Sequence, residues 1–177
     1  AVGSLVGQLA KIHGCYVAGS AGSDDKVEFL KNEAHFDVAF NYRTAGNLGK
    51  AIDAACPNGI DVYFDNTGGP ITDAVFPRLN MKARVAVCGQ IDQYNTPDAT
   101  GPRILWHLIV KRARAEGFLV SDYAERFPEA QKKIAQWLKE GRLTYRETVH
   151  DGLESTPKAF IGLFTGENTG KMLVRVS

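Results

Sequence analysis

The feature that most constrains the fold of this chain is the alternation of short apolar segments with amphipathic ones, joined by short turns. Residues 83–89 are nearly continuous in apolar character, which is typical of a strand covered on both faces of a parallel sheet. Residues 71–79, just before them, have the spacing of a helix. Parallel neighbours need a crossover connection, so strands that alternate with helices indicate βαβ units. The sequence therefore predicts an α/β fold with a doubly wound parallel sheet.

The same alternation runs through most of the chain and changes near its end. The predicted strands are residues 15–20, 36–42, 60–66, 83–89 and 114–120. The predicted helices are residues 24–33, 48–56, 71–79, 103–112 and 125–140. After Gly141 the pattern becomes an extended segment, a helix at 156–165 and a strand at 171–176. We therefore divide the chain into a nucleotide-binding domain, residues 1–144, and a tail, residues 145–177, that packs outside it.

The first residues read as the second half of a glycine-rich turn that runs directly into a helix. Gly3 precedes an apolar face formed by Leu5, Val6, Leu9 and Ile12 at helical spacing. In a dinucleotide-binding fold, such a helix N-terminus receives the pyrophosphate on free N–H groups. A strand normally precedes this turn, and none precedes it here. We therefore expect a piece of a larger enzyme, whose sheet lacks its first strand.

Composition excludes several classes of function. The chain has 21 basic and 20 acidic residues, a net charge of +1, so a polyanion-binding surface and a nucleic-acid partner are not expected. No apolar run approaches the roughly 20 residues that cross a bilayer. Cys15, Cys56 and Cys88 lack the paired spacing of metal ligands, so we predict cytoplasmic free thiols and no metal site.

The carboxyl ends of the predicted strands carry the residues that could bind a ligand. In an open parallel sheet the ligand lies beyond these ends. The residues placed there are Gly19, Ser20, Tyr42, Asn66, Thr67, Gly68, Gly69, Cys88, Gly89, Phe118, Leu119 and Val120. A glycine at any single end is explained by a tight turn alone. Small residues at several ends along one sheet edge favour a cofactor.

The end of the first predicted strand bears on the choice of cofactor. NAD-dependent enzymes place an acid there to hold the ribose hydroxyls. This chain has Ser20, Ser23 and Lys26 instead, whose hydroxyls and ammonium group would bind a 2′-phosphate. The nearby Asp24 and Asp25 suit the N-terminus of the following helix. The sequence therefore favours NADP over NAD.

Several longer strings resemble one enzyme family. They are Ala21-Gly22-Ser23-x-x-Lys26, Phe40-Asn41-Tyr42, Asp65-Asn66-x-Gly68-Gly69, Cys88-Gly89-Gln90-Ile91-x-Gln93-Tyr94-Asn95, Gln136-Trp137-Leu138-Lys139-Glu140-Gly141 and Gly166-x-Asn168-x-Gly170-Lys171. On these strings the chain resembles the zinc-independent medium-chain reductases of the leukotriene dehydrogenase, prostaglandin reductase and curcumin reductase branch. The resemblance covers essentially the whole chain.

The resemblance implies an architecture and a role for particular residues. The full enzymes have an N-terminal GroES-like catalytic domain, a Rossmann-like domain and a tail that returns to the catalytic domain. This chain would hold the Rossmann-like domain without its first strand, and the tail. The implied cofactor contacts are Val2 and Gly3 at the pyrophosphate, Lys26 and Tyr42 at the 2′-phosphate, Asn66 at the ribose, Cys88, Gly89 and Tyr94 along the nicotinamide half, Phe118, Leu119 and Val120 behind the nicotinamide ring, and Asn168 at a cofactor phosphate. The alternatives are a solvated helix lysine for Lys26, a half-buried strand aromatic for Tyr42 and a core residue for Phe118.

The reaction that the resemblance implies is hydride transfer from NADPH to the β-carbon of an enone, with Tyr94 as the catalytic hydroxyl that this chain contributes. The intact parent is expected to be a cytoplasmic homodimer. Two alternatives stay open, namely an NADPH-dependent quinone reductase and a non-catalytic NADP-binding module. By itself the chain is expected to be inactive, because the wall that holds the enone at near-attack distance would come from the other domain.

Overall fold

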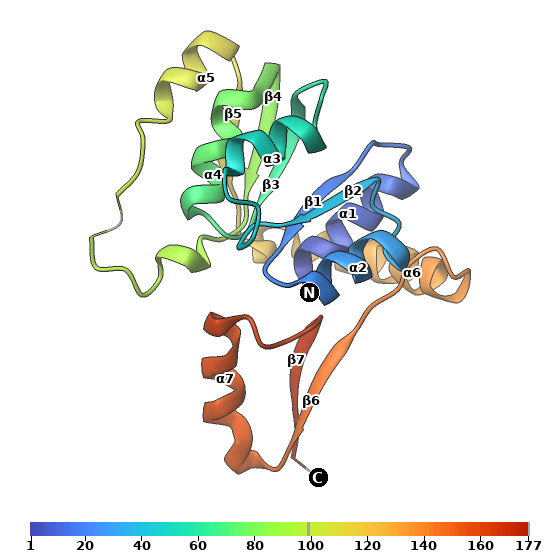
Figure 1. Ribbon diagram of the computed structural model, residues 1–177. Helices are drawn as coiled ribbons and strands as arrows, with labels where there is room; N and C mark the ends of the chain where they lie inside the picture. The colour runs from blue at the N-terminus through green and yellow to red at the C-terminus, as the bar shows by residue number, and fades with distance from the viewer. Residues whose placement is uncertain (99, 177) are drawn as a thin grey trace. The chain divides into compact units, whose positions relative to one another are not determined.

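The structure, a computed structural model, describes residues 1–98 and 100–176 and divides into two compact units (Figure 1). One unit contains residues 1–39 together with the chain from residue 134 onward, and the other contains residues 40–133. Helices alternate with strands in both, and the ladders of β3 with β4, β4 with β5 and β6 with β7 are all parallel. The predicted α/β class with a parallel sheet is therefore confirmed.

The unit of residues 40–133 is built on a three-stranded sheet with the order β3-β4-β5. Its elements are α3 (Leu48–Ala55), β3 (Ile60–Asp65), α4 (Gly69–Val75), η1 (Phe76–Arg78), β4 (Leu79–Val87), η2 (Ile91–Gln93), α5 (Leu105–Lys111), β5 (Arg114–Gly117) and η3 (Val120–Arg126). The core joins Ile52 of α3 and Val75 of α4 to Leu79 and Val85 of β4. Burial of these side chains packs both helices against the sheet.

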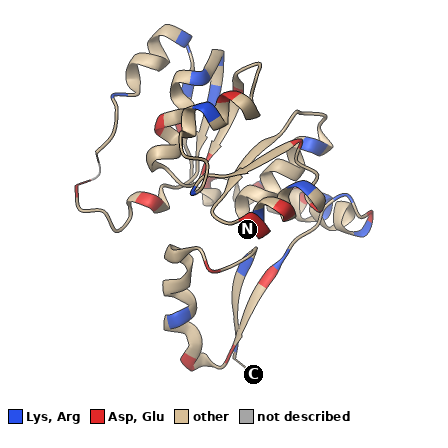
Figure 2. Cartoon of the chain, in the orientation of Figure 1, with Lys and Arg blue, Asp and Glu red and all other residues tan. Residues whose placement is uncertain are grey.

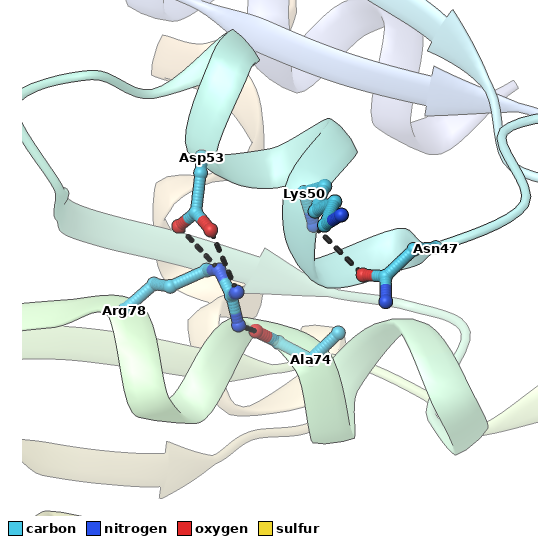
Figure 3. A network of polar contacts seen from close by, with 5 residues as sticks. All are labelled: Asn47, Lys50, Asp53, Ala74 and Arg78. Atoms are coloured by element: carbon cyan, nitrogen blue, oxygen red, sulfur yellow. Dashed lines mark hydrogen bonds and ion pairs between the residues drawn. The ribbon is translucent and has the colours of Figure 1, made fainter.

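A polar network ties α3 to η1 on the surface of this unit (Figure 3). Arg78 Nε and Nη2 donate to the two carboxylate oxygens of Asp53, at 2.6 and 2.9 Å, and Nη1 donates to Ala74 O at 2.9 Å. A Cβ on Gly49 would lie 2.5 Å from Arg78 Nη2, so the glycine leaves room for the guanidinium group. Asn47 begins α3, where its Oδ1 accepts from the backbone N–H of Lys50 at 2.9 Å.

The other unit packs two helices against a two-stranded sheet of β1 and β2. Its first elements are α1 (Val2–Ile12), β1 (Ala18–Ala21), α2 (Asp24–Asn32) and β2 (Val38–Asn41), and the last two residues of β2 are assigned to the other unit. Phe29, Leu30 and Phe36 are buried here. A Cβ on Gly7 would lie 1.9 Å from the Phe36 ring. Only glycine therefore lets α1 approach Phe36 this closely.

The C-terminal part of the chain contains a complete βαβ motif. The helix α6 (Phe127–Lys139) leads into β6 (Glu147–Asp151), η4 (Leu153–Ser155), α7 (Thr156–Thr165) and β7 (Lys171–Arg175). The strands β6 and β7 are parallel, with Glu147 opposite Lys171 and Asp151 opposite Arg175. Both acidic and basic residues are distributed over the helices and strands of the chain (Figure 2). Of the described helices, none is both long and apolar enough to span a membrane.

All five predicted strands of the alternating region have different limits in the structure, and the differences are largest for three of them. The strand predicted at residues 15–20 begins only at Ala18, and the one predicted at 114–120 ends at Gly117. The strand predicted at 83–89 starts earlier, at Leu79, because Leu79 pairs with Ile60 of β3. Its last two predicted residues leave the ladder, since their N–H groups turn toward a carbonyl at the end of β3. Strand limits depend on a partner strand, which local sequence patterns do not contain.

Candidate functional site

The carboxyl ends of three parallel strands meet at one edge of the sheet in the unit of residues 40–133. Asp65, the last residue of β3, lies opposite Val87 of β4, and Val87 lies opposite Gly117 of β5. The residues that follow these positions therefore leave the sheet at the same edge. In open α/β sheets this is the edge where ligands bind.

Backbone hydrogen bonds join the segments that follow β3 and β4. The N–H groups of Cys88 and Gly89 donate to Asp65 O at 2.7 and 3.3 Å. Farther along, Asp92 N donates to Thr67 O at 3.0 Å. The two segments are thus held against each other over several residues, so the side chains that they carry have defined positions.

Asn66, Gly89 and Tyr94 converge on one point of this edge. A Cβ on Gly89 would lie 3.0 Å from Asn66 Oδ1 and 3.2 Å from Tyr94 Oη. The Tyr94 hydroxyl accepts from Gln90 N at 3.3 Å, and the Tyr94 side chain is 64% exposed. A glycine flanked by an amide and a hydroxyl leaves space for a ligand to approach the backbone and offers it two polar groups.

An open cavity of about 480 Å³ lies beside this point, within the usual size range of small-molecule sites. Its lining residues are Val87, Cys88, Gly89, Gln90, Tyr94, Gly117, Phe118, Leu119 and Asp122. The structure therefore brings together most of the site residues predicted for this unit. Asn66 does not line the cavity itself but lies next to Gly89, and Val120 and Tyr42 do not line it either. Val120 is 69% exposed at the start of η3, and the Tyr42 ring has the Arg43 guanidinium carbon 6.0 Å from its centroid.

Two polar residues of the cavity were not predicted individually, although the stretch from Cys88 to Tyr94 was expected to line the nicotinamide half. Gln90 lies inside the string from Cys88 to Tyr94, so the motif already contained it. Asp122 lies beyond the end of β5, where its Oδ2 accepts from Leu119 N at 3.2 Å. An acid three residues after Leu119 is a local capping signal that sequence patterns could have identified.

The remaining predicted site residues lie in the other unit, around the N-terminus of α1 and the segment between α7 and β7. Val2 is the first residue of α1, and a Cβ on Gly3 would meet no atom within 4 Å. Lys26 Nζ donates to Gly166 O, at the C-terminus of α7. Asn168 Nδ2 donates to Gly170 O at 2.6 Å. Lys26 thus contacts the same short segment that carries Asn168.

Positive charge gathers near the first residue of α1. Lys26 and Lys171 lie close enough to the N-terminus of α1 for their charges to act on it. Lys171 was not predicted as a site residue, although it ends the string that contains Asn168. Cationic side chains near a helix N-terminus favour binding of an anion such as phosphate.

Comparison with known proteins identifies the family. The model of the family described as zinc-binding dehydrogenase matches residues 1–136. The chain belongs to the zinc-binding dehydrogenase family. Within it, the NADP(+)-dependent 2-alkenal reductase of Nicotiana tabacum is 49% identical over 177 residues, which cover 100% of this chain and 52% of the relative. The NADPH-dependent curcumin reductase of Escherichia coli (strain K12) is 41% identical over 183 residues, covering 99% of this chain and 52% of the relative.

A solved member of the family has the same fold. The crystal structure of CurA from Vibrio vulnificus in complex with NADPH is 42% identical, with a TM-score of 0.94, and the match covers 100% of this chain and 54% of that chain. The predicted resemblance to the reductase branch and the Rossmann-like fold are confirmed by these matches. The chain spans about half the length of the curated relatives that it matches.

The family description names zinc, but the donor set of this member differs from that of a zinc site. In the described part of the chain, no group of three or more His, Cys, Asp or Glu residues is placed to hold a metal ion. Cys15, Cys56 and Cys88 are free cysteines. Structural and catalytic zinc sites need three or four such ligands together. The described residues therefore do not fit a zinc site.

Proposed function

We propose that this chain is the NADPH-binding part of an oxidoreductase that reduces the activated carbon–carbon double bond of enones and alkenals. The observation that carries the proposal is the convergence of Asn66, Gly89 and Tyr94 beside the cavity at the carboxyl edge of the sheet. The names of the alkenal and curcumin reductases support the substrate class, and the NADPH complex of CurA supports the cofactor.

In this proposal the cavity residues hold the nicotinamide half of the cofactor. Phe118 and Leu119 offer an apolar wall, whereas Asn66 and Tyr94 offer polar groups that can orient the ribose and the substrate oxygen. Cys88 and Gly89 also line the cavity. NADPH, when bound, supplies the hydride for the β-carbon of the substrate. Tyr94, with its exposed hydroxyl, is the residue of this chain proposed to act next to the reacting atoms.

The phosphate groups of the cofactor are assigned to a second set of residues. Val2 and Gly3 would bind the pyrophosphate through N–H groups at the start of α1, whose N-cap residue Ala1 makes no side-chain capping bond. Lys26 and Tyr42 would bind the 2′-phosphate. Asn168 would reach a phosphate from the tail. The lysine charges near the N-terminus of α1 support this assignment.

The domain organisation and assembly of the intact protein belong to the same proposal. Residues 1–144 form the NADP-binding domain, and residues 145–177 are the tail of a GroES-like catalytic domain supplied by the rest of the parent. The parent would be a cytoplasmic homodimer that acts on small molecules. Quinone reduction is not favoured as an alternative, because the alkenal and curcumin reductases point to a different substrate class.

The test is an NADPH oxidation assay on the full-length protein that contains this chain. We expect turnover with enones and alkenals in the ordinary enzyme range, about 1–10³ s⁻¹, and little with quinones. The 177-residue chain alone should show no turnover, because in this proposal the wall opposite the cavity comes from the rest of the parent. Activity of the full-length protein with quinones alone would contradict the proposed substrate class. Absence of NADPH binding would contradict the proposal as a whole.

A further inference from the structure

The carboxylate of Asp65, at the end of β3, is a buried ionisable group that the proposed chemistry does not use. Asp65 is only 1% exposed, although the segment that follows it forms part of the candidate site. A buried carboxylate is costly unless several donors compensate for the lost water. The donors around Asp65 therefore indicate what this group does.

One carboxylate oxygen of Asp65 organises the turn that carries Asn66. Asp65 Oδ1 accepts from Thr67 N at 3.0 Å and from Gly68 N at 2.8 Å. These two N–H groups belong to the residues directly after Asn66. Gly68 has a φ of 72°, a conformation that favours glycine. The carboxylate thus holds the backbone on the C-terminal side of Asn66 in a tight turn of the kind that aspartate stabilises.

The other oxygen of Asp65 joins this turn to α4. Thr72 Oγ1 donates to Asp65 Oδ2 at 2.9 Å. The Tyr63 hydroxyl lies 3.0 Å from Thr72 Oγ1 and donates to Asp65 Oδ1 at 3.4 Å. Burial raises the pKa of the Tyr63 phenol, so this hydroxyl remains a donor at neutral pH. The carboxylate is therefore surrounded by side-chain donors as well as by backbone ones.

The main chain of Asp65 holds the segment of the candidate site that follows β4. Its carbonyl accepts from the N–H groups of Cys88 and Gly89. A single residue thus holds the segments after β3 and β4 together, one through its side chain and the other through its carbonyl. This arrangement sets the positions of Asn66 and Gly89 relative to each other. It therefore also sets the 3.0 Å distance from Asn66 Oδ1 to the position that a Cβ on Gly89 would take.

We infer that Asp65 is a positioning residue for the cofactor site, whose buried carboxylate holds the turn after β3 so that Asn66 faces Gly89 and Tyr94. The inference rests on the proposed function, because it assigns this turn to the nicotinamide half of the cofactor. That half is identical in NADPH and NADH. Loss of the carboxylate must therefore weaken the binding of both cofactors by the same factor. Loss of a group that binds the 2′-phosphate would weaken the binding of NADPH alone.

The test measures the dissociation constants of NADPH and NADH by fluorescence titration of the full-length protein, with the melting temperature recorded for each variant. Asp65→Ala leaves Thr67 N and Gly68 N without their acceptor, and both constants should rise about tenfold or more. Asp65→Asn keeps one acceptor oxygen for these N–H groups, so both constants should stay within about threefold of the wild type. Thr72→Val removes the bond to Asp65 Oδ2 and the contact with the Tyr63 hydroxyl, and it leaves both backbone bonds to Oδ1 in place. It should lower the melting temperature and leave both constants within about twofold.

The outcomes separate this inference from the proposed function. Wild-type protein that binds neither cofactor would overturn the proposed function. Wild-type protein that binds NADPH, together with a folded Asp65→Ala variant of equal affinity, would overturn only the role of Asp65. Equal losses of cofactor affinity in Asp65→Ala and Thr72→Val would also overturn the role of Asp65, because they would show that general destabilisation of the protein weakens binding. If Asp65→Ala does not fold, Asp65→Leu replaces it, because leucine has a similar shape and no acceptor, and both dissociation constants should rise by the same factor.

Discussion

Gln8 and Thr144 bind each other through a pair of hydrogen bonds that runs in both directions. Gln8 Nε2 donates to Thr144 O at 3.0 Å, and Thr144 N donates to Gln8 Oε1 at 2.7 Å. Gln8 is 3% exposed on α1, and Thr144 lies in the segment between α6 and β6. The side-chain amide of Gln8 therefore replaces a strand partner for the main-chain N–H and C=O of one residue. It ties α1 to the last residue before the proposed tail.

Gln8→Ala should lower the free energy of unfolding by about 1–3 kcal/mol. The variant leaves the N–H and carbonyl groups of Thr144 without their partner in a partly buried position, and unpaired groups of this kind carry a penalty of that size. The measurement is urea denaturation of the full-length protein. Gln136→Ala is the matched control, because Gln136 is an exposed helical glutamine whose amide contacts Glu140, and its effect should stay within about 0.5 kcal/mol. Equal effects of the two variants would contradict the role given to Gln8.

Lys26→Ala should weaken NADPH binding by about tenfold or more and leave NADH binding nearly unchanged. A charge-assisted contact with the 2′-phosphate contributes about 1.5–3 kcal/mol, and NADH has no such phosphate. Titration of both cofactors against the full-length protein checks this. Lys31→Ala, an exposed lysine at the other end of α2, is the control and should change neither affinity. A similar loss for both cofactors would remove the assignment of Lys26 to the 2′-phosphate.

Tyr94→Phe should change kcat or KM for enones while the free energy of unfolding stays within about 1 kcal/mol of the wild type. The hydroxyl that it removes is exposed and makes only a long bond with Gln90 N, so its loss has little effect on packing. Steady-state kinetics with several enones provide the test. Tyr145→Phe removes a hydroxyl from another exposed tyrosine and serves as the comparison. Unchanged constants for Tyr94→Phe across the series would show that its hydroxyl takes no part in the reaction.

The ion pair of Asp53 and Arg78 should make stability depend on pH in the acid range. The hydrogen bond from Arg78 lowers the pKa of Asp53 below its ordinary value of 3.8. A carboxylate whose pKa is lowered by folding contributes stability above its unfolded pKa, and the contribution disappears as the pH falls through the folded pKa. The difference in unfolding free energy between wild type and Asp53→Asn should therefore shrink below about pH 4.

The same measurement in an Arg78→Met background provides the control for this ion pair. The methionine side chain keeps an apolar stem of similar length but donates no hydrogen bond to the carboxylate. In that background, the effect of Asp53→Asn on the unfolding free energy should no longer change over the same pH range. A pH dependence that persists without Arg78 would show that another group lowers the pKa of Asp53.

The succession of helices and strands could be predicted because its signals are local. Asn47 caps α3 through a residue only three positions away, and Gly59, with a φ of 77°, marks the turn before β3. The fold class follows from such signals together with the apolar periods of the segments between them. Strand limits were less accurate. The early start of β4 depends on the pairing of Leu79 with Ile60, and no pattern around residue 79 shows that partner.

The sequence alone determined which residues are available at the ends of the strands, and the motifs determined the family. Only the tertiary structure decided how these residues meet. Asn66, Gly89 and Tyr94 come together because β3 and β4 end in register, and Lys26 contacts Gly166, which lies 140 positions away in the sequence. The turn bonds of Asp65 are local and could have been expected from an aspartate three residues before a glycine. Its burial could not, because burial arises when distant segments exclude water from the same carboxylate.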